Sequence, residues 1–229
     1  MIDIALINRT NRIRDARFAD ILPALQAQIT DDFCPAWGVE PVTLRLVGRA
    51  EQPDPAHWKV WLLNTSDVPG DLGYHEADTG TPEAKIYVET DILSGSEISV
   101  TISHELLEML ADPTTTRMGP VIDGAQYIVE VCDAVESDTD GYQKLGLTHS
   151  VQVSNFVLPA YYESGAAGPW DFRKLLTAPC PTLRPGGYSM FYKDSAWSST
   201  MARYADGSLS PRSIRQKGRS WQRTQLPVP

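Results

Sequence analysis

Residues 103–113 have the sequence SHELLEMLADP, in which His104 and Glu105 are followed by a second glutamate, Glu108. Apolar side chains recur at helical spacing around this motif, which predicts an amphipathic helix over residues 95–110. They are Ile98, Ile102, Leu106, Met109 and Leu110. The helix is expected to end at Asp112, because the residue before a proline is disfavoured in the helical conformation.

His104 and Glu108 are four residues apart, so they lie on one face of this helix. Glu105 is rotated from His104 by about 100° and lies near the edge of that face. In enzymes with an H-E-x-x-H helix, this spacing lets two side chains hold a metal ion while the first glutamate reaches a metal-bound water. A glutamate at the second position remains a ligand but adds negative charge. The alternative is an exposed polar stripe on an otherwise buried helix.

A third ligand is expected downstream, in the segment YIVEVCDAVESDTDGY at residues 127–142. Its carboxylates alternate with apolar residues, and buried carboxylates are costly unless they are paired or bound to metal. Glu130 is well spaced to complete a three-ligand site, and Asp133 is the second candidate. Asp133 could instead accept a hydrogen bond from the other ring nitrogen of His104. Cys132 is a further candidate, although strand alternation would point it the other way.

The other apolar segments predict several strands and one further helix. Residues 15–30 carry apolar side chains at helical spacing, with Pro23 inside the pattern. The predicted strands are residues 2–8, 42–48, 58–66 and 84–90. The order strand, helix, three strands, helix predicts an α+β fold with a mixed, twisted sheet. Of its two main helices, the second carries the H-E-x-x-E motif.

The net charge of −9 is unevenly distributed along the 229 residues. Residues 193–229 contain seven Lys or Arg and two Asp, whereas residues 1–192 are acidic. We therefore predict one domain over residues 1–192 and a basic C-terminal extension over residues 193–229. The acidic body argues against binding nucleic acid through its main surface, because phosphate contacts require Lys and Arg. The extension is either solvated or a docking segment for an acidic partner or for the body itself.

Other sequence features concern the cellular compartment. No apolar run approaches the roughly 20 residues of a membrane span. The N-terminal sequence MIDIALINRTNRIRD lacks the pattern of a secretory signal. Cys34, Cys132 and Cys180 are too few and too scattered for a disulfide framework. These features predict a reduced, cytoplasmic protein without membrane contact, or one released without the usual secretion route.

The predicted order of elements, ending in SHELLEMLADP, resembles the architecture of zincin metalloproteases. In that architecture, the last strand before the metal helix is an antiparallel edge strand that binds extended substrate, and AKIYVET at 84–90 takes this position. The segments GYHEADTGTPEAKIYV, SHELLEMLADP, EVCDAVE and SNFVLPAYY are also similar to zincin-like proteins of phages and prophages. The SHELLE and E-x-C-D portions more weakly resemble the plant EXORDIUM-like family.

This resemblance implies a metal-dependent hydrolase that cleaves a peptide or protein substrate. It implies a zinc ion held by His104 and Glu108 together with Glu130 or Asp133, with Glu105 as the general base. Calcium or manganese are the alternative metals, because one imidazole with several carboxylates suits harder cations. The similarity to phage proteins adds virion association as an alternative location.

Two further residues are candidates for substrate or transition-state contacts. His75 in GYHE could donate to the transition state or act as an extra ligand, although its neighbours favour a surface turn. Tyr161 follows NFVLPA at a position suited to the substrate side of a zincin site. The competing class is a non-catalytic zincin-like protein whose metal braces a structural or binding protein, as in a phage particle. A fully closed set of ligands would favour that class over catalysis.

Overall fold

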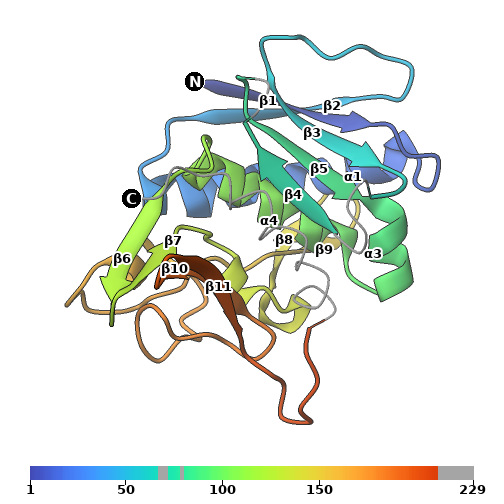
Figure 1. Ribbon diagram of the computed structural model, residues 1–229. Helices are drawn as coiled ribbons and strands as arrows, with labels where there is room; N and C mark the ends of the chain where they lie inside the picture. The colour runs from blue at the N-terminus through green and yellow to red at the C-terminus, as the bar shows by residue number, and fades with distance from the viewer. Residues whose placement is uncertain (67–71, 78–79, 211–229) are drawn as a thin grey trace.

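The computed structural model describes residues 1–66, 72–77 and 80–210, and it shows an α+β fold as predicted (Figure 1). Its main sheet has five strands in the order β2-β1-β3-β5-β4. The strands are β1 Ile2–Asn8, β2 Val42–Val47, β3 Trp58–Leu63, β4 Gly73–Glu76 and β5 Glu83–Tyr87. All pairs are parallel except β4 with β5, which is antiparallel.

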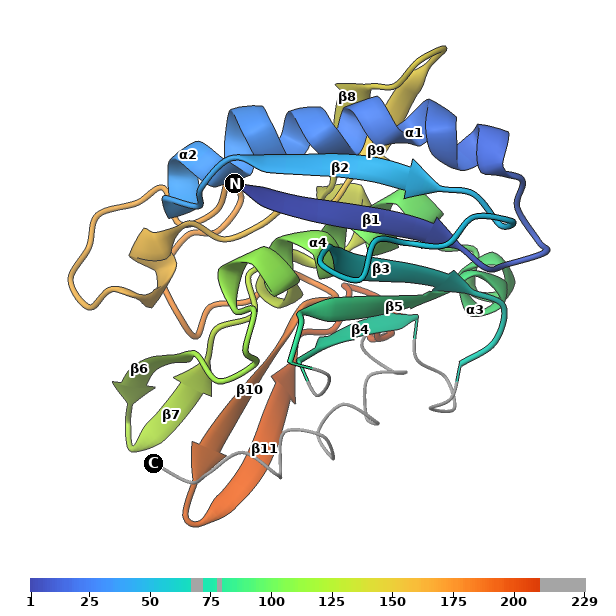
Figure 2. The ribbon, with the colours of Figure 1, turned by 90° about the horizontal axis from the view of Figure 1, so that it is seen from above.

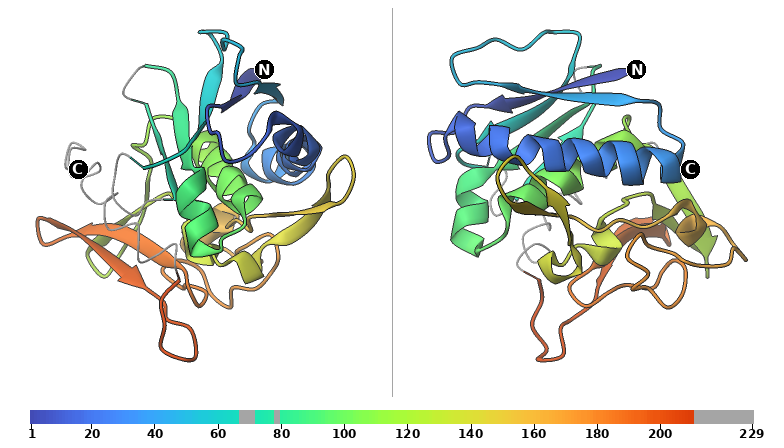
Figure 3. Two further views of the ribbon diagram at one scale, coloured as in Figure 1. Left: turned by 90° about the vertical axis from the view of Figure 1, so that its right-hand side faces the viewer. Right: turned by 180° about the vertical axis from the view of Figure 1, so that it is seen from behind.

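Two long helices cover one face of this sheet (Figures 2 and 3). The first, α1 (Asp15–Ala27), continues through a π-helical segment (Gln28–Phe33) into α2 (Cys34–Trp37). It contains Pro23 and buries its apolar stripe against the sheet. The predicted helix over residues 15–30 is therefore present and extends further than its pattern suggested.

The second long helix, α4 (Ile98–Ala111), follows a short helix, α3 (Val88–Ser94). Every residue of α4 except Ile98 is buried. At its start, the backbone N–H of Glu97 donates to Asp138 at 3.0 Å. The helix ends at Ala111, as predicted from Asp112-Pro113, and the Asp112 carboxylate accepts hydrogen bonds from the loop that follows.

The burial of α4 follows from a second layer of structure on its other side (Figures 1 and 3). This layer contains a four-stranded antiparallel sheet in the order β11-β10-β7-β6 and a two-stranded sheet of β8 and β9. The strands are β6 Met118–Ile122, β7 Ala125–Ile128, β8 Tyr142–Leu145, β9 Ser150–Val153, β10 Tyr188–Lys193 and β11 Ala196–Met201. Short 3-10 turns lie at Asp133–Val135, Asp138–Asp140 and Pro159–Tyr162. The helix α4 is therefore enclosed by protein on both sides.

The structure corrects the predicted run of three strands before the motif helix. Four strands lie there, because GYHE forms β4, a strand too short for its alternation to be recognised. The prediction that AKIYVET is the antiparallel edge strand is wrong. Its first part lies in β5, an internal strand parallel to β3, and the chain turns helical at Val88. The antiparallel edge strand of the described sheet is β4.

The predicted boundary between residues 192 and 193 falls inside the hairpin of β10 and β11, whose strands pair from Tyr188–Met201 to Lys193–Ala196. Beyond the hairpin, the hydroxyls of Tyr204 and Ser137 lie 3.0 Å apart, so this part of the chain contacts the body. The rest of the predicted extension, residues 211–229, lies outside the described residues.

Cys34, Cys132 and Cys180 are all free thiols. Among the described helices, none combines the length and apolarity that a membrane crossing needs.

The packing of α1 gives a direct test of the fold. Leu25 is fully buried in the main core, so Leu25→Ala is expected to lower the free energy of unfolding by about 2–5 kcal/mol. Leu93 in α3 is 76% exposed, and Leu93→Ala should change stability by no more than about 0.5 kcal/mol. Urea denaturation of the two variants measures both values. Equal effects would contradict the packing of α1 described above.

Candidate metal centre

Three polar side chains of the H-E-x-x-E motif project from α4 into the interior. His104 and Glu105 are each 2% exposed, and Glu108 is fully buried. The Nε2 atom of His104 lies 3.1 Å from Oε1 of Glu108, as expected for residues one turn apart on one face. The alternative of an exposed polar stripe is therefore wrong, because these groups are inside the protein.

The chain returns to α4 after β7 and brings a second carboxylate to the same nitrogen. Asp133 Oδ1 lies 3.2 Å from His104 Nε2. The backbone N–H of Cys132 donates to Glu108 Oε1 at 3.2 Å, which fixes the segment against the helix. Both carboxylates therefore lie against Nε2, although Asp133 does not belong to a group of mutually close ligand atoms with His104 and Glu108.

The electrostatic surroundings of His104 favour a cation. Burial alone would lower the pKa of His104, but the carboxylates of Glu108, Asp133 and Glu105 outweigh it and raise that pKa to about 10. A metal ion that binds Nε2 must therefore displace a proton from the ring. The same negative charges that hold the proton would attract a divalent cation. His104 Nδ1 is buried and has no hydrogen-bond partner among the described residues, so Asp133 does not orient the ring through that nitrogen.

Cys132 lies beside this group, contrary to its prediction from strand alternation. Its Sγ lies within ligand distance of His104 and Glu108 and contacts the backbone carbonyl of His104 at 3.8 Å. The alternation argument failed because the segment enters a 3-10 turn at Asp133 and is not a strand. Burial, together with the charge of Glu108, raises the pKa of the Cys132 thiol well above its usual range. Cys132 is therefore a neutral thiol unless a metal displaces its proton.

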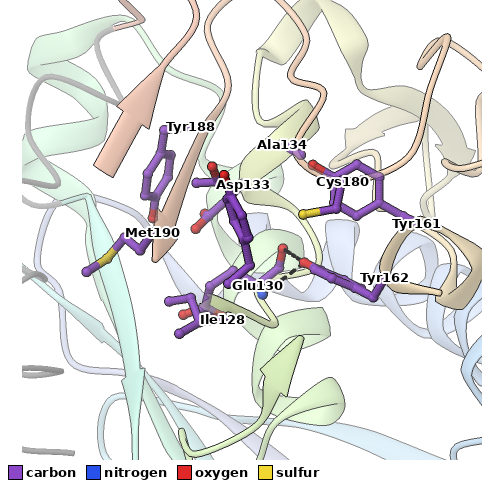
Figure 4. Close-up of a pocket in the computed structure, with 11 residues that line it drawn as sticks. Ile128, Glu130, Asp133, Ala134, Tyr161, Tyr162, Cys180, Tyr188 and Met190 are labelled. Carbon is purple, nitrogen blue, oxygen red and sulfur yellow. Dashed lines mark hydrogen bonds between the residues drawn. The ribbon is translucent and has the colours of Figure 1, made fainter. Parts of the chain in front are cut away.

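Neither Glu130 nor Asp133 belongs to a group of described residues whose ligand atoms lie close enough together to hold a metal. The backbone N–H and carbonyl of Glu130 are both bonded to the Tyr162 hydroxyl, at 3.1 and 2.8 Å. Glu130 and Asp133 line a narrow pocket together with several aromatic residues (Figure 4). The pocket has room for about one water molecule. Of the two candidate third ligands, the structure thus brings only Asp133 to the imidazole.

Tyr161 lines the same pocket (Figure 4). Its hydroxyl donates to the backbone carbonyl of Thr182 at 2.9 Å, and only 2% of the residue is exposed. Burial raises the pKa of Tyr161 well above its usual range, so the hydroxyl stays protonated. That hydroxyl is therefore committed to a structural hydrogen bond.

His75 approaches α4 from the opposite side to Asp133, because the edge strand β4 directs it inward. Its Nδ1 lies 3.8 Å from Glu105 Oε2 and 3.9 Å from Glu108 Oε2. The side chain is 2% exposed, so the interpretation of His75 as a surface-turn residue is wrong. The sequence did not indicate that His75 is buried. The short segment GYHE is surrounded by glycine and acidic residues, a composition that is typical of a turn.

Gly73 allows β4 to come this close to the helix. A Cβ atom at Gly73 would lie 3.1 Å from Glu105 Cγ and 2.8 Å from the backbone oxygen of Lys85. A residue with a side chain would therefore push the strand away from Glu105. On the other face of the strand, Tyr74 and Glu76 both contact the Lys85 amine at 2.7 Å, which fixes which face of β4 carries His75.

The described residues thus contain two overlapping groups of side chains beside α4 that could hold a metal ion. One contains His104, Glu108 and Cys132, with Asp133 at the same imidazole, and the other contains His75, Glu105 and Glu108. No protein family, curated protein or solved structure matches this chain. The chemistry of the site therefore follows from its own geometry.

Proposed function

We propose that this protein is a zinc-dependent hydrolase, with peptides as its substrates. The observation that supports this most is the convergence of Glu108 and Asp133 on Nε2 of His104, with Glu105 next to them on the same helix. The first three side chains would hold the metal, and Glu105 would be the general base. One imidazole and two carboxylates are a donor set that zinc accepts.

A zinc ion held there would polarise the scissile carbonyl and make a water molecule a better nucleophile. The carboxylate of Glu105 accepts a proton from the attacking water and passes it to the nitrogen of the leaving amine. His75, at 3.8 Å from Glu105, orients that carboxylate and limits its movement. Glu108 contributes a negative charge where H-E-x-x-H enzymes have a neutral ligand. The attacking water would therefore be less acidic, and activity should require a higher pH.

The substrate class rests on the position of β4. It is the antiparallel edge strand of the described sheet, and its His75 side chain is directed at the motif helix. An extended peptide that pairs with such an edge would place its backbone near the site. An antiparallel edge strand beside the motif helix supports the zincin-like architecture that we propose from the sequence.

A second candidate function has one observation in its favour. The side chains of His104, Glu105, Glu108 and Asp133 are no more than 3% exposed. A closed set of buried ligands is typical of a structural site, in which the metal braces the fold of a binding protein. Calcium or manganese would suit that role, because most of the donors are carboxylate oxygens.

Metal content distinguishes a real centre from a chance arrangement. Purified wild-type protein is expected to retain at least one zinc ion per chain, measured by elemental analysis without chelators. Glu108→Ala should lose that ion, because Glu108 belongs to both groups of candidate ligands. Its affinity for the metal should fall by more than the roughly 10–100-fold that is typical when a residue that only supports a ligand is changed. Glu105→Gln should retain it. Glu163→Ala, which removes an exposed carboxylate, is the matched control and should bind as the wild type does. Protein free of any divalent metal would contradict the proposal, and calcium in place of zinc would favour the bracing role.

Hydrolysis separates the two candidate functions once metal is bound. Zinc-loaded wild-type protein is expected to cleave members of a quenched fluorescent peptide library. With one equivalent of zinc bound in each protein, Glu105→Gln should reduce kcat by about 10²–10⁴-fold, because the amide cannot accept the proton. Glu163→Ala should cleave at the wild-type rate. If the loaded wild-type protein cleaves no peptide while its thermal stability depends on the metal, the bracing role replaces the hydrolase.

A further inference from the structure

The two carboxylate oxygens of Glu108 face two different imidazoles. Oε1 lies 3.1 Å from His104 Nε2, and Oε2 lies 3.9 Å from His75 Nδ1. The two histidines come from different elements, α4 and β4, and approach the carboxylate separately. This is the arrangement of a carboxylate that bridges two positions, each with its own imidazole.

The position on the His75 side has ligand atoms of its own. His75 Nδ1 lies 3.8 Å from Glu105 Oε2, and ligand atoms of His75, Glu105 and Glu108 all lie within 4.8 Å of one another. All three side chains are buried, with at most 2% of each exposed. One imidazole nitrogen and two carboxylates form a donor set suited to first-row divalent cations such as zinc and manganese.

A second observation concerns the ring of His75. Its Nε2 atom is buried and has no hydrogen-bond partner among the residues that the structure describes. Burying a polar ring nitrogen without a partner is unfavourable. The nitrogen that faces Glu105 and Glu108 is Nδ1, so a cation in this position would bind the Nδ1 lone pair and Nε2 would carry the ring proton.

One ion cannot use both histidines in this geometry. Within residues 1–66, 72–77 and 80–210, neither group of mutually close ligand atoms contains both His75 and His104. A cation at His104 therefore leaves the His75 side available. Two-metal sites commonly have ions about 3.5–4 Å apart, which one bridging carboxylate can span.

From this geometry we propose a second divalent-cation position bounded by His75, Glu105 and Glu108, with Glu108 bridging it to the ion at His104. The inference rests on the proposed function, because it requires the first ion. It also assigns Glu105 a second state. With one ion bound, Glu105 is the base that accepts the proton of water, and with two ions bound its carboxylate is a ligand.

The test is a count of bound ions combined with a spectroscopic measurement of their separation. Metal-free protein is loaded with Zn²⁺ or Mn²⁺, and bound ions are counted by native mass spectrometry. Wild-type protein is expected to bind two ions and His75→Ala one. His149→Ala, which removes a half-exposed histidine away from α4, is the matched control and should bind two. In electron paramagnetic resonance, two Mn²⁺ ions bridged by Glu108 should give a coupled signal, and His75→Ala should give the six-line signal of an isolated ion.

The outcomes separate this inference from the proposed function. One ion in both wild type and His75→Ala would overturn the second position and leave the first intact. No ion in the wild type would overturn both. Two ions in wild type and in His75→Ala would place the second ion elsewhere and would also overturn the inference. Circular dichroism establishes that each variant is folded, and His75→Gln, which retains a side chain of similar size, replaces His75→Ala if the latter unfolds.

Discussion

The whole structure depends on keeping charged side chains inside the protein on a helix that is buried on all sides. The main sheet covers one side of α4, and the layer built after it covers the other. A buried carboxylate is tolerated only with compensating groups close by. His104 supplies one such group, and its pKa of about 10 reflects the negative charge around it. A proton on His104 and a metal ion at His104 are alternative ways to balance that charge, which is why we propose a cation site on this helix.

The glutamate in place of a second histidine changes what the helix can do. A histidine would offer one nitrogen to one ion. Glu108 has two oxygens, and they face two different imidazoles, one from its own helix and one from β4. The edge strand therefore contributes a side chain to the proposed metal centre and also bounds the sheet. Gly73 makes this possible, because any larger residue there would separate β4 from Glu105.

The sequence predicts well those elements whose apolar pattern extends over many residues. Strands β1, β2 and β3, the helix α1 and the end of α4 all follow from apolar patterns and a proline. The α+β class follows from their order. Tertiary contacts set the rest. Spacing along the chain could not rank Glu130 above or below Asp133, because a 3-10 turn, and not a strand, directs the side chains there. The burial of His75 could not be predicted either, because β4 is too short to have a recognisable pattern. Its pairing with β5 directs the His75 side chain inward.

The central claim is that His104, Glu108 and Asp133 together hold a metal ion. Crystals of zinc-loaded protein, with diffraction data recorded on both sides of the zinc absorption edge, test it most directly. The account predicts an anomalous peak at bonding distance, about 2.0–2.2 Å, from His104 Nε2 and from oxygens of Glu108 and Asp133. A peak bound only by surface residues, or no peak beside α4 in fully loaded crystals, would contradict it.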